Sequence, residues 1–142
     1  PQYSFKIKSI SKALNNLIKS YKDCYTYSEE VKTLINSVLE NPEFIGGTTS
    51  FDTKVMKASK GKIFCKSGAE GVFLFIDIQK EISGVIKITD GNERAIPIVI
   101  LSVFKKLKIM SNIELKNLEK KEKFKLQNHA GRNIGHISLT IK

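Results

Sequence analysis

A lysine followed by a small hydroxyl residue and a glycine stands between two apolar segments of the chain. These residues are Lys66, Ser67 and Gly68, and Gly71 follows closely. A lysine here would present its ammonium at a strand edge, and glycine would let a ligand approach the backbone. Backbone N–H groups at Gly68 or Ala69 would be free to face a developing oxyanion. The triplet is therefore either the corner of a hairpin or one side of an active site.

A nucleophile that could work with this lysine is harder to find. The same order of residues, lysine, hydroxyl residue and glycine, forms the K-T-G element of serine β-lactamases, whose nucleophile lies in an S-x-x-K motif elsewhere. Three serines here have a lysine at that spacing, namely Ser9, Ser59 and Ser102. We expect the first and last inside helices and the second in a loop, so none has the required context. No G-x-S-x-G elbow supports a Ser-His-Asp triad either. A hydrolase of this kind would need a nucleophile upstream of Pro1.

Length and composition favour one domain. A chain of 142 residues can bury one hydrophobic core. Charges interrupt its apolar residues, and no stretch approaches the roughly 20 apolar residues of a membrane span. We therefore expect no membrane partner and a cytoplasmic location. Because the chain begins at Pro1 without a signal-peptide pattern, we interpret residues 1–142 as a single domain cut from a longer protein.

The net charge of +10 raises nucleic acid as a partner. Only Arg94 and Arg132 are arginines among the 24 cations, although arginine is the residue best suited to bidentate phosphate contacts. The densest lysine run, 116–125, is interleaved with Glu119 and Glu122 and predicts a solvated helical face. We expect no nucleic-acid partner, but a non-catalytic basic binding domain remains the alternative from another functional class.

The metal-ligating residue types are few and scattered. Cys24 and Cys65 have no C-x-x-C spacing, so a buried or unpaired thiol is expected at each. His129 and His136 are separated by a glycine-rich turn and would not share a helical face. The sequence predicts no metal site and no cofactor within this chain.

Helical periodicity dominates the first third of the chain. Apolar residues at intervals of three and four predict two amphipathic helices, the first carrying Ile7, Ile10, Leu14, Leu17, Ile18 and Tyr21. Ser28 is the expected N-cap of the second helix, and Pro42 follows where it should end. Ser50 is expected to cap a short third helix that turns Phe51, Val55 and Met56 inward.

The middle of the chain reads as strands. We expect them at Lys62 to Lys66, Val72 to Asp77 and Ser83 to Thr89. Asp90-Gly91 predicts a strand-to-helix turn with an Asx cap.

The last part of the chain returns to helices. Asn92 can cap a helix through about Leu107, and Pro97 fits either a kink or a late start. Asn112 to Lys121 predicts a short exposed helix, and residues 134–142 alternate like an edge or closing strand. This order predicts an α+β fold with an antiparallel sheet flanked by helices.

Four motifs occur in a fixed order and carry a resemblance when taken together. They are Phe51-Asp52-Thr53, the segment from Lys66 to Gly71, the segment from Lys87 to Gly91 with Arg94-Ala95, and the segment from Asn128 to Arg132. Over Phe51 to Ile137 the chain resembles the C-terminal half of the L-asparaginase II family. The fold of this zinc-associated group is similar to that of serine β-lactamases, penicillin-binding proteins and glutaminases. In the family a Gly-Cys-Ser-Ala-Pro stretch precedes the first helix, so Pro1 would be its proline.

The resemblance implies hydrolysis of L-asparagine to L-aspartate and ammonia by a serine nucleophile activated by lysine. It also implies an N-terminal S-x-x-K pair, and a zinc held by two cysteines and a lysine in the full-length protein. All of these lie outside this chain, and Cys24 and Cys65 match no zinc ligand. We therefore expect the missing N-terminal half to be the partner of this fragment, and the fragment alone to be inactive.

Lys66 matches the second catalytic lysine of the family. A lysine acts as a base only when desolvation or a neighbouring cation lowers its pKa, and as an alternative Lys66 could be a fixed cation for the α-carboxylate of the substrate. The resemblance implies substrate or oxyanion contacts for the residues next to it: Ser67, Gly68, Ala69 and Glu70. Glu70 is equally consistent with a turn residue that bonds backbone N–H groups.

The remaining motif residues have several interpretations. Asn128, His129 and Arg132 form a polar cluster that could contact the site, form a subunit interface in a homodimer, or brace their own loop. We interpret Asp52 as a first-turn helix acid rather than a catalytic group. A glutaminase or a penicillin-interacting relative of the same fold remains an alternative, because asparagine and glutamine differ by one methylene.

Overall fold

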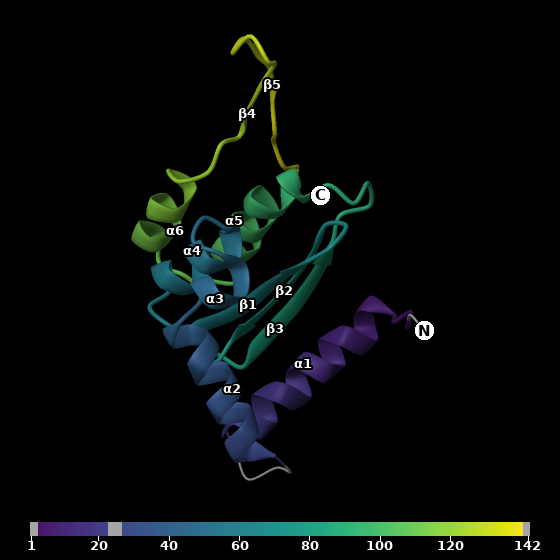
Figure 1. The fold of residues 1–142 in the computed structure, drawn as a ribbon, viewed down its shortest axis with the longest axis vertical. Coiled ribbons are helices and arrows are strands. Elements are labelled where there is room, and N and C mark those ends of the chain that lie inside the picture. The colour runs from purple at the N-terminus through teal and green to yellow at the C-terminus, as the bar shows by residue number, and fades with distance from the viewer. Residues whose placement is uncertain (1–2, 23–26, 141–142) are drawn as a thin grey trace.

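The computed structural model describes residues 3–22 and 27–140. Within these ranges helices precede a three-stranded antiparallel sheet, and two further α-helices and a β-hairpin follow it (Figure 1). The expected α+β architecture, an antiparallel sheet flanked by helices, is confirmed. In the described ranges no helix combines the length and the apolar character needed to cross a membrane.

The two N-terminal helices form where the apolar periodicity places them. Helix α1 spans Ile7–Lys22 and α2 spans Ser28–Glu40, two residues before Pro42. The expected cap at Ser28 is wrong. Tyr27 precedes the helix with a φ of 68° in the left-handed region, and no side chain caps the helix start. Ser28 is already the first helical residue.

A very short helix and a capped helix lead into the sheet. Helix α3 covers Glu43–Gly46 and α4 covers Phe51–Ala58. The Oγ of Ser50 accepts the N–H of Thr53 at 3.3 Å, which confirms the predicted cap. Val55 and Met56 are buried, as expected.

The main sheet has the order β1-β2-β3, with β1 at Ile63–Gly68, β2 at Val72–Asp77 and β3 at Ile82–Lys87. The first strand was expected to end at Lys66, but it continues because Ser67 and Gly68 pair with β2. The turn therefore occupies residues 69–71, where Glu70 and Gly71 have φ values of 58° and 70°. The third strand begins one residue earlier and ends two residues earlier than predicted.

Side chains alternate between two hydrophobic clusters on the two faces of the sheet. One face of β2 carries Ile76, which packs with Leu14 and Ile18 of α1. The other face of β1 and β2 packs with helices from both halves of the chain, including α2 and α4. This core includes Val38, Val55, Met56, Ile63, Cys65, Phe73, Phe75, Ile100, Phe104 and Leu118. The rings of Phe75 and Phe104 meet edge-on, with centroids 5.0 Å apart.

Two helical segments follow the sheet. The 3-10 helix η1 covers Glu93–Ala95 and leads into α5 at Ile96–Lys106. The Oδ1 of Asn92 accepts the N–H of Arg94 at 2.9 Å, so the cap is confirmed, although it opens η1 rather than α5. Pro97 lies in the first turn of α5, where a missing N–H costs nothing. The helix starts late and is not kinked by Pro97.

The sixth α-helix is more buried than its sequence pattern indicated. Helix α6 spans Asn112–Glu119, and Leu115 and Leu118 are buried. The lysine run 116–125 is not one helical face, because the helix ends at Glu119.

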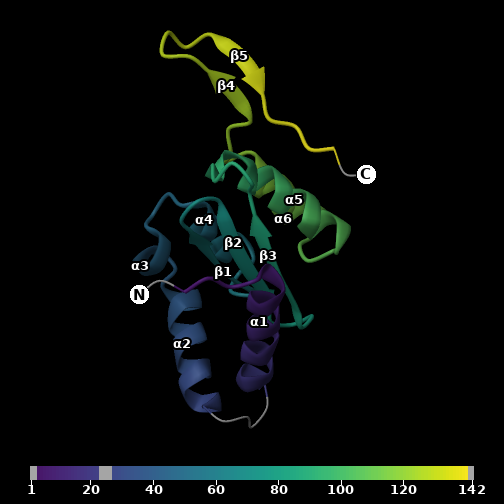
Figure 2. The same ribbon diagram turned by 90° about the vertical axis from the view of Figure 1, so that its right-hand side faces the viewer.

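The C-terminal hairpin was only partly anticipated. Strands β4 (Lys125–Gln127) and β5 (Asn133–His136) form a separate two-stranded sheet. Both views show it extending away from the main body (Figure 1, Figure 2). The predicted terminal strand over 134–142 is wrong in its extent, since β5 ends at His136 and residues 137–140 are not in a strand; residues 141 and 142 lie outside the described ranges. The pattern gave no sign of β4, because three residues are too few to show alternation.

Candidate functional site

An open pocket of about 430 Å³ lies beside strand β1. Lys66 and Ser67 of β1 form part of its lining. The start of α4, with Phe51 and Asp52, forms another part, and the segment from Glu93 to Pro97 contributes a third. Ile45 and Gly46 of α3 complete the lining, so four segments of the chain converge on the space next to Lys66.

Asp52 anchors the strand side of this pocket. Its side chain is 1% exposed, and its Oδ2 accepts the N–H of Ser67 at 3.1 Å. That N–H points away from β2, because N–H groups along an antiparallel strand alternate in direction, and Asp52 supplies the acceptor that a further strand would otherwise provide. The Oδ1 of Asp52 accepts the N–H of Thr53 at 3.1 Å. The carboxylate thus ties the first turn of α4 to the edge of the sheet.

Lys66 is held beside this buried carboxylate. Its Nζ lies 3.6 Å from the Oδ2 of Asp52 and donates to the carbonyl oxygen of Ser67 at 2.6 Å. The lysine side chain is 42% exposed, so its ammonium remains open to the pocket. Burial acts to raise the pKa of Asp52, but the Ser50 hydroxyl, the Ser67 N–H and the Lys66 charge outweigh it and hold that pKa below its ordinary value.

The turn after β1 is pinned to the loop after β3. The N–H of Ile88 donates to the carbonyl oxygen of Gly71 at 2.8 Å. A Cβ added at Gly71 would meet the carbonyl carbon of Gly91 at 3.1 Å and the Cβ of Ile88 at 2.8 Å. Lys87 also donates its ammonium to the carbonyl oxygen of Glu70. The backbone of the 69–71 turn is thus fixed against residues 88–91.

The loop after β3 has the Asx geometry that its sequence predicts. The Oδ1 of Asp90 accepts the N–H of Asn92 at 3.0 Å, and the Oδ2 of Asp90 accepts from the Nη2 of Arg94 at 2.9 Å. These contacts place Arg94 in the lining of the pocket.

Comparison with known protein families decides the relationship. A family model described as L-asparaginase II matches residues 1–139. The chain belongs to the L-asparaginase II family. A search of curated proteins finds no match to the chain. The match extends beyond the four motifs to helices α1 and α2. Membership of the L-asparaginase II family supports the activity of an asparaginase-like amidohydrolase.

The residues predicted around the turn are close to one another. Gly68 pairs with Val72 in the sheet, and Ala69 and Glu70 are exposed in the turn that follows. Within the described residues, the Ala69 N–H has no backbone partner and the Glu70 carboxylate bonds no turn N–H. The interpretation of Glu70 as a residue that bonds the turn N–H groups therefore has no contact in its favour.

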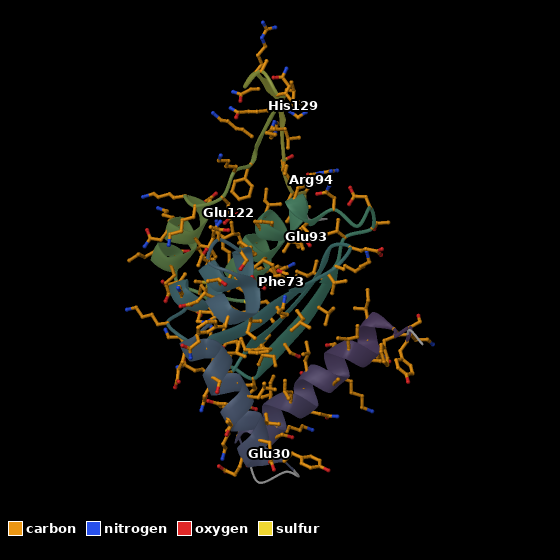
Figure 3. The ribbon with its side chains drawn as sticks, in the orientation of Figure 1. Glu30, Phe73, Glu93, Arg94, Glu122 and His129 are labelled. Atoms are coloured by element: carbon orange, nitrogen blue, oxygen red, sulfur yellow. The ribbon has the colours of Figure 1, made fainter. Side chains whose placement is uncertain are left out.

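The second predicted group lies elsewhere in this L-asparaginase II chain. Asn128, His129 and Arg132 are at the tip of the β4–β5 hairpin, and Figure 3 shows His129 at its outer end, away from Phe73 in the sheet. The Oδ1 of Asn128 accepts the N–H groups of Ala130 and Arg132, at 3.1 Å and 2.9 Å, and so braces the loop. The structure does not bring these residues to Lys66, and their role at a subunit interface stays a prediction.

The zinc that the L-asparaginase II resemblance implies has no matching donor set here. Cys65 is fully buried, its Sγ lies 3.5 Å from the carbonyl oxygen of Asp52, and burial raises the pKa of this thiol well above its ordinary value. Such a thiol is a poor metal ligand. Cys24 lies outside the described residues. In ranges 3–22 and 27–140 no three His, Cys, Asp or Glu side chains are grouped to hold a metal ion.

None of the three S-x-x-K serines lines the pocket beside Lys66. Ser9 is exposed on α1, and Ser102 lies on α5. Ser59 is buried, donates to the carbonyl oxygen of Met56 at 3.0 Å and accepts the N–H of Ile63 at 3.3 Å. Its hydroxyl is therefore engaged in holding the start of β1.

Asp52 is the site residue that sequence reasoning undervalued. It does lie in the first turn of α4, as predicted, but its contacts with Lys66 and Ser67 were not anticipated. The sequence did contain a signal. Asp52 follows Phe51, which was expected to point into the core, so Asp52 could also be buried, and a buried carboxylate almost always has a charged or hydrogen-bonding partner.

Proposed function

We propose that the protein carrying this chain hydrolyses the side-chain amide of L-asparagine, and that Lys66 is a catalytic residue. The observation that carries the proposal is the position of the Lys66 ammonium. It is half-exposed in an open pocket and oriented by the buried Asp52 carboxylate and the Ser67 carbonyl oxygen. Family membership supports the reaction class.

The reaction is a two-step acyl transfer. A serine hydroxyl attacks the amide carbon and its proton passes to a base. The base then gives this proton to the amide nitrogen, the C–N bond breaks, and ammonia leaves. Water then hydrolyses the ester to release L-aspartate and the free serine. We assign the nucleophile to a part of the protein outside this chain, because the S-x-x-K serines of this chain do not line the pocket.

Lys66 and the turn after β1 would assist the two parts of this reaction, the proton transfer from the serine and the formation of the oxyanion. The Lys66 ammonium would hydrogen-bond the attacking serine, or the base that takes its proton. Ala69 would donate its N–H to the oxyanion, and it is a better donor than Gly68 because Gly68 is paired with Val72 in the sheet. Ser67 would hydrogen-bond the substrate from the same edge.

The test is ammonia release from L-asparagine by the full-length protein and its Lys66→Met variant. We expect kcat to fall about 100-fold or more, the usual effect of removing a group that assists proton transfer. Lys106→Met is the matched control, since it removes the same charge from the exposed end of α5.

Two results would contradict the proposal. Undiminished turnover in Lys66→Met would overturn the catalytic role of Lys66. A wild-type protein that releases no ammonia from L-asparagine would overturn the activity itself. Parallel assays with L-glutamine separate the glutaminase alternative, for which the preference between the two amides would be reversed.

A further inference from the structure

The pocket contains a second pair of charged residues, one acidic and one basic, next to each other in the sequence. Glu93 and Arg94 of η1 line the same pocket as Lys66 and Ser67. Figure 3 shows both at the start of the helical segment after the sheet, between the sheet and the hairpin. The backbone N–H of Arg94 is bonded to the Asn92 side chain, so the position of the pair on the loop is fixed.

These two charges are available to a ligand, whereas the Asp52 charge is not. The buried Asp52 carboxylate is already matched by Lys66 and by backbone N–H groups. The ion pairs at the pocket, within the part of the chain that the structure describes, are Lys66 with Asp52 and Arg94 with Asp90, and Glu93 takes part in neither.

Arg94 keeps most of its hydrogen-bonding capacity. A guanidinium has five N–H donors in a planar fork, and Asp90 is bonded through Nη2. The side chain is 54% exposed, so the remaining donors can reach a ligand in the pocket. A planar fork matches a carboxylate with two parallel hydrogen bonds.

A carboxylate beside a guanidinium is complementary to a zwitterion. An α-amino acid carries an ammonium and a carboxylate on one carbon atom, and these would face Glu93 and Arg94 respectively. We propose that Glu93 and Arg94 bind the amino-acid head group of the substrate and direct its side-chain amide toward Lys66 and Ser67, which line the same pocket. This inference rests on the proposed function, and it makes Arg94, not Lys66, the cation for the α-carboxylate.

Three amides that differ only in the head group test this assignment in the full-length protein. L-asparagine has both charges, succinamate lacks the ammonium, and β-alaninamide lacks the carboxylate. Glu93→Gln should lower kcat/KM for L-asparagine and β-alaninamide roughly 10-fold or more, as expected for a lost charged hydrogen bond, and leave succinamate unchanged. Arg94→Gln should lower kcat/KM for L-asparagine and succinamate and leave β-alaninamide unchanged.

Matched controls remove the same charges elsewhere. Glu40→Gln at the end of α2 and Lys106→Gln at the end of α5 alter exposed residues outside this pocket. Neither should change the ranking of the three amides. A uniform loss on all three substrates in the Glu93 and Arg94 variants, or no loss, would overturn the head-group assignment.

A binding measurement separates this inference from the proposed activity. Calorimetric titration of the same proteins with L-aspartate, succinate and β-alanine requires no turnover. We expect Glu93→Gln to weaken the binding of L-aspartate and β-alanine, and Arg94→Gln to weaken the binding of L-aspartate and succinate. If the wild-type protein hydrolyses no amide, the proposed function fails and this binding pattern alone decides the inference. Absence of L-aspartate binding to the wild-type protein would overturn it.

Discussion

The Nζ of Lys66 and the Oδ2 of Asp52 lie 3.6 Å apart, with the lysine facing the pocket and the carboxylate 1% exposed. The same Oδ2 accepts the N–H of Ser67. One buried carboxylate therefore holds both the Lys66 ammonium and the backbone of Ser67 at the edge of the strand. Because Asp52 belongs to α4, the position of Lys66 depends on how that helix packs on β1.

Replacing this carboxylate by its neutral amide tests the arrangement. Asp52→Asn presents an N–H₂ group to the Ser67 N–H or to the Lys66 ammonium, so donors face donors. We expect the free energy of unfolding at neutral pH to fall by about 1–3 kcal/mol, the cost of leaving a buried donor unpaired. Urea unfolding of the two proteins measures it.

The difference between these two proteins should depend on pH. The pKa of Asp52 is lowered in the folded state, so its contribution to stability is complete above the unfolded value of about 3.9 and is lost as pH falls through the lower folded value. The gap between wild type and Asp52→Asn should therefore narrow when unfolding is repeated below about pH 4. A gap that stays constant with pH would contradict the ionised Asp52 anchor.

Gly84 of β3 is required beneath an aromatic ring. A Cβ at this position would lie 2.5 Å from the Cε1 of Phe75, which is 2% exposed and packed edge-on against Phe104. Gly84→Ala should therefore cost about 1–3 kcal/mol, the usual cost of overpacking. Gly135→Ala in β5 is the matched control, because its Cβ would meet Leu126 at an ordinary 3.7 Å. Equal urea midpoints for the two variants would refute the close packing at Gly84.

Two serines at helix starts should behave differently. The Ser111 Oγ accepts the N–H of Glu114, and the Glu114 carboxylate accepts the N–H of Ser111, whereas no side chain caps the start of α2 at Ser28. Ser111→Ala should lower the free energy of unfolding by about 1 kcal/mol. Ser28→Ala should change it by less than about 0.5 kcal/mol. Thermal unfolding compares them, and a larger loss at Ser28 would contradict the observed capping.

Features that depend on a few neighbouring residues could be predicted from the sequence. The caps at Ser50 and Asn92 each need a partner within three positions, and helices α1 and α2 follow from apolar periodicity alone. The wrong prediction at Ser28 also has a local cause. An N-cap residue normally has an extended backbone, but the residue at that position, Tyr27, is in the left-handed region.

Features that depend on distant residues were missed. Strand β1 runs on to Gly68 because β2 pairs with it, and nothing within residues 62–68 specifies that pairing. The contact between Asp52 and Lys66 joins two elements, so neither motif alone indicates it. The motifs predicted a site role for Lys66, and the structure shows this residue in the lining of a pocket. The contribution of the segment from Glu93 to Pro97 to that lining could be seen only in the fold.

The contact between Gly71 and Gly91 joins the turn that carries Ala69 to the loop that leads to Glu93 and Arg94. It is made between main-chain atoms, which have no rotamers with which to adjust. In the proposed enzyme, this contact therefore fixes how far apart the main chains of the turn and of the loop lie, while the side chains of Lys66, Glu93 and Arg94 span the rest of the pocket. A ligand with one further methylene would then have to be accommodated by different side-chain rotamers at Lys66 or Arg94, because the two main-chain segments cannot move apart without losing their contact.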